Sequence, residues 1–197
     1  MNSKENSVLE RLAALSLERC LVKLSKVSAG TWELLDTAAA RGTLLDAVGL
    51  YDFRGGPAAA IYVDVAGEVS LATLVLFDPE GMDCISKCFL GYSFPRSRSV
   101  SQSEEVMLLE LGNILLNSLC NSIMNALRAS FIPSVPRFCS GGRSAIAEAL
   151  GPGIPSGSDP RIVAVTLGMR SGASESRCKV LLLVPGALAQ ALEQAAA

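Results

Sequence analysis

Residues 71–89, LATLVLFDPEGMDCISKCF, and residues 176–195, SRCKVLLLVPGALAQALEQA, follow one pattern in the two halves of the chain. Each begins with an aliphatic and β-branched run that is typical of a buried strand. A proline, a glycine and a short stretch with helical spacing then follow, and proline and glycine are common where a new element begins. The shared order indicates an internal duplication, although few positions are identical.

The pattern extends outward from these two stretches. Each half begins with a long helix, continues with a short helical piece and two strands, and ends with a closing helix. We therefore expect one domain over residues 1–197, made of pseudo-repeats at about 1–93 and 100–197. The predicted fold is α+β, in which duplicated helix-strand-strand-helix units form a shared, mainly antiparallel sheet with the two long helices packed on it. The expected elements are long helices at about 5–27 and 104–131, short helical pieces at about Trp32–Ala40 and Arg143–Leu150, and strands at 57–65, 67–77, 161–167 and 177–184, with a hairpin turn near Ala66-Gly67.

Composition excludes several classes of function. Half of the residues are hydrophobic and 18% are charged, so the chain has enough apolar surface to fold compactly. The formal net charge is only −2 and no basic cluster stands out, which argues against a nucleic-acid or anionic-lipid partner. No segment looks like a signal sequence or a membrane span, so a cytoplasmic location is expected.

The reactive residue types narrow the chemistry further. The chain has no histidine, which excludes Ser-His-Asp and Cys-His catalysis and histidine-ligated metal within it. Its six cysteines form no CxxC pair, and Cys84 and Cys88 alone are a weak metal signal, so reduced, mostly buried thiols are expected. The glycine-rich run 140–144 lacks the phosphate-binding lysine motif and is interpreted as a turn at a helix start.

The second long helix carries a polar stripe on an otherwise apolar segment. Ser101 or Ser103 can cap it, and Glu110, Asn113 and Asn117 fall on one side at about 100° per residue, with Asn121 and Arg128 continuing the stripe. A solvated face explains such a stripe, and the residues alone favour that explanation over a functional one. However, asparagine is a poor helix former, so an accumulation of amides also suggests hydrogen bonding to a partner.

The motif around this stripe resembles a known signature. Glu110-Leu-Gly-Asn113, followed by Pro136 with 22 residues between Asn113 and the proline, is similar to the E-x2-N-x22-P pattern of the CheC/CheX/FliY-type chemotaxis phosphatases. The run ELGNILLNSLCNSIMNAL also looks like the helix that carries this pattern in CheC proteins, and the duplication matches that family's internal repeat. The specific part of the resemblance covers about 30 residues.

The resemblance implies a mechanism. Proteins of this family remove the phosphoryl group from the aspartyl phosphate of a CheY-like response regulator. By this resemblance, Asn113 would orient the attacking water and Glu110 would pair with the receiver's active-site lysine, while Asn117 and Pro136 would line or shape the contact surface. The chain would need no cofactor of its own, because the receiver would supply Mg²⁺. The implied partner is a phosphorylated CheY-like receiver.

The sequence departs from the family pattern at two places. Val106 stands where an Asp or Ser is common, four residues before Glu110. In the first long helix, the positions matched by an offset of one hundred are Glu10, Ala13 and Leu17, so this copy of the site would be inactive. A single intact copy is closer to CheX and allows a homodimer, and the apolar face around Leu17 would either serve that dimer or pack inside.

Three functions therefore stay open. The first is a response-regulator phosphatase, which requires Glu110 and Asn113 exposed side by side. The second is a CheC-like binding or scaffold protein that engages a receiver or another signalling partner without hydrolysis, and it requires only the exposed surface. The third is a small-molecule sensor or structural domain with a merely solvated helix, and it predicts no receiver binding.

Overall fold

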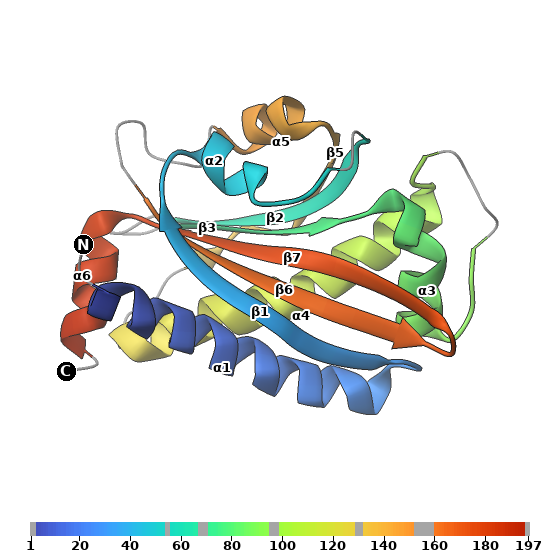
Figure 1. The fold of residues 1–197 in the computed structure, drawn as a ribbon, viewed down its shortest axis with the longest axis horizontal. Coiled ribbons are helices and arrows are strands. Elements are labelled where there is room, and N and C mark those ends of the chain that lie inside the picture. The colour runs from blue at the N-terminus through green and yellow to red at the C-terminus, as the bar shows by residue number, and fades with distance from the viewer. Residues whose placement is uncertain are drawn as a thin grey trace.

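The computed structural model describes residues 3–53, 56–66, 71–94, 99–128, 132–151 and 160–195. These residues form one open sheet with helices on both of its faces (Figure 1). The helices are α1 (Ser3–Val27), α2 (Leu44–Gly49), α3 (Met82–Leu90), α4 (Gln102–Leu127), α5 (Arg143–Leu150) and α6 (Gly186–Ala195), with a 3-10 turn at Pro79–Gly81. The strands are β1 (Thr31–Arg41), β2 (Ala58–Ala66), β3 (Leu71–Phe77), β4 (Ile132–Pro133), β5 (Arg137–Gly141), β6 (Arg161–Ser171) and β7 (Ser174–Val184).

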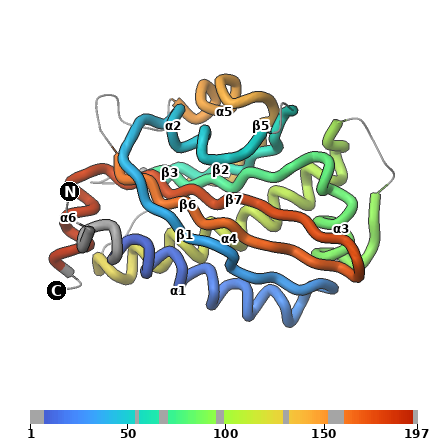
Figure 2. The backbone as a smooth tube through the Cα atoms, in the orientation of Figure 1, coloured from blue at the N-terminus to red at the C-terminus, as the bar shows by residue number. Residues whose placement is uncertain are grey.

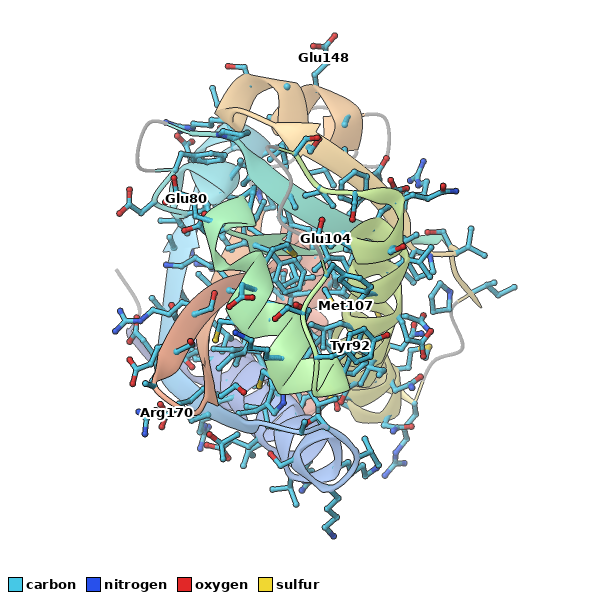
Figure 3. All side chains as sticks on the ribbon, turned by 90° about the vertical axis from the view of Figure 1, so that its right-hand side faces the viewer. Glu80, Tyr92, Glu104, Met107, Glu148 and Arg170 are labelled. Atoms are coloured by element: carbon cyan, nitrogen blue, oxygen red, sulfur yellow. The ribbon has the colours of Figure 1, made fainter. Side chains whose placement is uncertain are left out.

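The two long helices α1 and α4 lie side by side on one face of the sheet, whereas the short helices α2 and α5 lie on the other (Figure 1). The larger core fills the space under α1 and α4, and the smaller one lies under α2 and α5. Helices α3 and α6 lie at opposite ends of the long-helix layer, as the tube trace shows (Figure 2). Figure 3 views the end of the molecule at which α3 contacts α4.

The sheet has a symmetrical strand order. It runs β1-β6-β7-β3-β2, with β4 and β5 both pairing with the outer edge of β2, and every neighbouring pair is antiparallel. If each first-half strand is exchanged for its second-half counterpart (β1 with β5, β2 with β6, β3 with β7), the same order is read from the opposite edge. Each hairpin of one half is therefore flanked by the edge strand of the other, and the two halves share one sheet. The predicted α+β class and antiparallel sheet are confirmed.

The prediction of a helical piece at Trp32–Ala40 is wrong, because this segment is strand β1, paired along its length with β6. Its alanines and leucines favour a helix locally, but tertiary pairing overrides such propensities. The strand pattern is hidden in the sequence by a bulge between Leu34 and Asp36. Trp32 and Leu34 face the larger core before the bulge, and Ala39 faces it after the bulge. The core-facing side chains therefore change from even-numbered to odd-numbered positions, and the regular alternation of a strand is broken.

The other expectations hold with changed bounds. The helices at both long segments and at residues 143–150 are confirmed, and α4 ends at Leu127 rather than near residue 131. The hairpin of β2 and β3 is confirmed, but its turn at 67–70 lies outside the described residues. Strands β6 and β7 are longer than predicted and meet at a two-residue turn in which Gly172 has φ 60. Helix α2 and strands β4 and β5 were not predicted from the sequence.

All six cysteines are free, and all but the half-buried Cys139 are buried, as predicted. Within the described part of the chain, α4 is the one helix whose length and apolar composition would suit a membrane span. Its apolar side packs against the sheet and α1, as expected of a core helix.

Candidate functional site

The polar stripe of α4 is the uncovered side of that helix. Glu110 is exposed and Asn113 and Asn117 are half-buried, while Val106, one turn before Glu110, is 61% exposed. We call these four residues the α4 ridge. The side chains on the opposite side of the helix are fully buried against the sheet, among them Leu108, Leu111, Leu115 and Leu119.

Helix α4 begins where its sequence provides a cap. Ser101 Oγ accepts a hydrogen bond from the backbone N–H of Glu104, and the Glu104 carboxylate accepts one from the backbone N–H of Ser101 at 2.7 Å. This capping box satisfies two backbone donors that would otherwise lack partners. The prediction that Ser101 or Ser103 caps the helix is confirmed, with Ser101 as the capping residue.

Close contact with the sheet fixes the rotation of α4 about its axis. A Cβ built on Gly112 would lie 2.7 Å from the Cβ of Ile61 in β2 and 2.5 Å from its Cγ2, so the helix backbone touches the strand at this point. Only glycine allows this approach without a shift of the helix. Because Gly112 precedes Asn113, the contact that buries the glycine determines which way the asparagine points.

Contact with α1 fixes the helix from a second side. The buried Ser16 of α1 donates a hydrogen bond to the Ser118 carbonyl oxygen at 2.9 Å, and Ser122 Oγ donates to Ser16 Oγ at 2.9 Å. These small side chains let the two helices approach closely while their polar atoms stay paired. Together with Gly112, they leave the α4 ridge as the side that faces outward.

The two asparagines of the ridge are bonded to each other. Asn117 Nδ2 donates a hydrogen bond to Asn113 Oδ1 at 2.6 Å. The contact follows from helix geometry, because residues four apart are neighbours and a helical side chain leans toward the N-terminus, over the preceding turn. Among the described residues, Glu110 has no hydrogen-bond or ion-pair partner, so its carboxylate is available to a ligand.

Pro136 lies in the short segment between β4 and β5, at the edge of the sheet. This segment is held to β2 by Asp64, whose carbonyl oxygen accepts from the Ser134 N–H at 2.8 Å and whose N–H donates to Ser134 Oγ at 3.2 Å. The Asp64 carboxylate also pairs with Arg137, which stacks on the Tyr62 ring with its guanidinium carbon 4.5 Å from the ring centre.

The structure therefore brings together Glu110, Asn113 and Asn117 on one helix face, whereas Pro136 belongs to a neighbouring edge segment. Strand β5, which follows Pro136, contacts α4, and the half-buried Phe138 of β5 packs on the core beneath that helix. Pro136 itself is half-buried and makes no hydrogen bond to the ridge.

The α1 residues that were predicted to match Glu110, Asn113 and Asn117 are wrong by one position. Ala13 and Leu17 are 0% exposed, so they cannot occupy an outward face. The buried positions of α1 and α4 coincide when the offset is ninety-nine residues, which matches Glu110, Asn113 and Asn117 with Arg11, Ala14 and Glu18. The first copy still lacks the asparagine, since Ala14 stands in its place. The apolar residue Leu17 packs inside, so the dimer surface suggested around it does not exist on that face.

No metal centre is formed by the described residues, in which no group of three or more histidine, cysteine or acidic side chains is arranged to hold an ion. An open cleft of about 880 Å³ lies away from the ridge, between β1, β7 and the turn at Pro79–Gly81. Its lining mixes the carboxylates of Asp36, Asp78 and Glu175 with Lys179, and none of the ridge residues contributes to it.

In sequence comparisons, no protein-family profile and no curated protein matches this chain. Solved structures with the same fold do match. FliY from Thermotoga maritima aligns with a TM-score of 0.71 at 11% identity, over 99% of this chain and 96% of that one. The FliM middle domain from H. pylori aligns at 0.66 and 10% identity, over 99% of each chain.

A third match comes from the CheX-CheY-BeF3-Mg complex of Borrelia burgdorferi. It has a TM-score of 0.55 at 15% identity, over 89% of this chain and 96% of that one. The alignments span nearly the full length of each protein, so the likeness concerns the whole duplicated architecture and not one motif. The chain has the fold that CheX, FliY and the FliM middle domain share.

Proposed function

We propose that this protein hydrolyses the aspartyl phosphate of a CheY-like receiver domain, and that the α4 ridge enters the receiver's active site. The observation that carries the proposal is that the exposed Glu110 and the half-buried Asn113 lie one turn apart on the outward side of α4, in a fold shared with CheX. The CheX match, which was crystallised with CheY and Mg²⁺, supports a receiver as the partner.

In this reaction a water oxygen forms a bond to phosphorus while the bond between phosphorus and the aspartyl oxygen breaks, releasing inorganic phosphate and the receiver's free carboxylate. Asn113 would orient the water, since an amide can accept a hydrogen bond from it and also donate one to a phosphoryl oxygen. Glu110 would pair with the receiver's lysine and fix the docking register. The receiver would supply Mg²⁺, and this chain would supply position and electrostatics.

Asn117 and Pro136 would border the docked receiver, and Val106 would present an apolar side chain to it. A cytoplasmic location follows from this role, because receivers of this class work inside the cell. The reaction would use no histidine of this chain, and the chain contains none.

A binding or scaffold protein is the alternative. The matches to FliY and to FliM favour it, because FliM was also crystallised with FliG and with SpeE, which shows that this fold serves contacts with different partners. The same exposed ridge would then bind a partner without hydrolysis. The two functions differ in whether the amide of Asn113 is required.

The test measures the decay of phosphorylated CheY-type receivers from the same organism, with wild-type protein, Glu110→Ala, Asn113→Ala and the control Asn121→Ala. Binding to each receiver is measured in parallel. We expect Asn113→Ala to lower the acceleration on the order of 100-fold while binding persists, since it removes one positioned group. Glu110→Ala should weaken binding, and Asn121→Ala should behave as wild type. Binding without accelerated decay would favour the scaffold, and the absence of both would reject both functions.

A further inference from the structure

We propose that Asn117 is a positioning residue, which holds the side-chain amide of Asn113 in the orientation that the attacking water requires. This inference rests on the proposed function and adds a residue to its machinery. The observation behind it is the 2.6 Å hydrogen bond from Asn117 Nδ2 to Asn113 Oδ1, between two half-buried side chains on consecutive turns of α4.

The bond removes an ambiguity that a lone asparagine has. The terminal torsion of asparagine is broad and roughly two-fold, so an exposed amide exchanges its oxygen and nitrogen between two directions. When Asn113 Oδ1 accepts from Asn117, this oxygen is directed toward the Asn117 amide, and the Nδ2 group of Asn113 therefore points away from it. The carbonyl oxygen has a second lone pair, so it can still accept a hydrogen bond from a water.

The backbone beneath the pair is also fixed. Gly112 touches Ile61, and Ser118 is hydrogen-bonded to Ser16, so the helix on both sides of the pair is anchored to its neighbours. A fixed backbone together with a fixed amide is the condition for a catalytic group to act without reorganisation. Asn121, the next amide along the stripe, is exposed and forms no such pair among the described residues, which makes it the matched control.

Three substitutions separate positioning from docking. Asn117→Ala removes the donor, and Asn117→Asp keeps the shape but offers an acceptor, so that Asn113 must turn its Nδ2 toward it. Asn117→Gln keeps an amide donor and serves as the conservative rescue. We expect kcat for receiver dephosphorylation to fall on the order of tenfold in Asn117→Ala and at least as far in Asn117→Asp, with KM changed less than about twofold and with activity partly retained in Asn117→Gln.

A second measurement does not depend on activity. The side-chain amide of Asn113 is followed by nitrogen relaxation in the free protein, and its order parameter should drop in Asn117→Ala but not in Asn121→Ala. An unchanged order parameter would overturn the inference, as would a rise in KM with kcat unchanged, which would make Asn117 a docking residue only. If the wild-type protein hydrolyses no receiver phosphate, the proposed function fails, and the order parameter still decides whether Asn117 orients Asn113.

Discussion

The contact between Gly112 and Ile61 gives the sharpest prediction for the fold that supports the ridge. In Gly112→Ala the new methyl group would lie 2.5 Å from Ile61 Cγ2, 2.7 Å from its Cβ and 3.1 Å from its Cγ1. A change of rotamer cannot relieve the contact with the Cβ, because the strand backbone fixes that atom. The helix must therefore move away from β2.

The magnitude follows from two opposing effects. Overpacking of a filled core costs about 1–3 kcal/mol, and the upper part of this range applies because the Cβ cannot move. Alanine recovers about 1 kcal/mol over glycine inside a helix. The net loss of unfolding free energy should be about 2 kcal/mol, which lowers Tm by about 4–8 °C for a chain of this size.

Urea and thermal unfolding of the wild type and Gly112→Ala would measure this loss, with Gly186→Ala as the control. Gly186 begins α6 and has no atom within 4 Å of an added Cβ, so alanine there should leave the stability unchanged or raise it. In an Ile61→Ala background, two of the three close contacts disappear and the cost of Gly112→Ala should shrink. If Gly112→Ala instead raised the unfolding free energy by about 1 kcal/mol, helix propensity alone would explain the result. Gly112 would then not lie as close to Ile61 as described.

Three further predictions concern other parts of the molecule. Ser101→Ala removes the cap of α4 and should lower the unfolding free energy by about 1 kcal/mol in urea titrations, whereas Ser103→Ala should not. Burial raises the pKa of the Cys120 thiol to about 11 from its ordinary 9.0, and because the unfolded thiol ionises first, stability should fall as pH rises from about 9 to 11. Cys120→Ala should flatten that part of the stability-pH curve, even though it lowers stability at neutral pH, and a curve as steep as that of wild type would contradict this. Arg137→Ala loses a partly exposed ion pair and a stacking contact, so thermal unfolding should report a loss of about 1 kcal/mol, and a neutral result would mean that these contacts do not hold the edge segment.

The sequence by itself determined the elements whose signals are local. Hydrophobic spacing and caps located α1, α3 and α4, the apolar runs located the central strands, and the common strand-proline-glycine-helix order in residues 71–89 and 176–195 indicated two similar halves. The outward direction of Glu110, Asn113 and Asn117 was also predictable, because the apolar side of a helix packs on a sheet and leaves the other side in water.

The tertiary structure decided what depends on pairing between distant segments. Residues 31–41 became strand β1 because β6 offers partners along its whole length, and the bulge at Leu34 and Asp36 hid the alternation that would have revealed it. The alignment of α1 with α4 follows from which side chains each helix buries against the shared sheet. Because Ala13 is buried, the residue of α1 that corresponds to Asn113 is Ala14. The bond from Asn117 to Asn113 needs both side chains to face the same open side at fixed rotation, and that rotation is imposed by Ile61 and Ser16, which lie far from the ridge in the sequence.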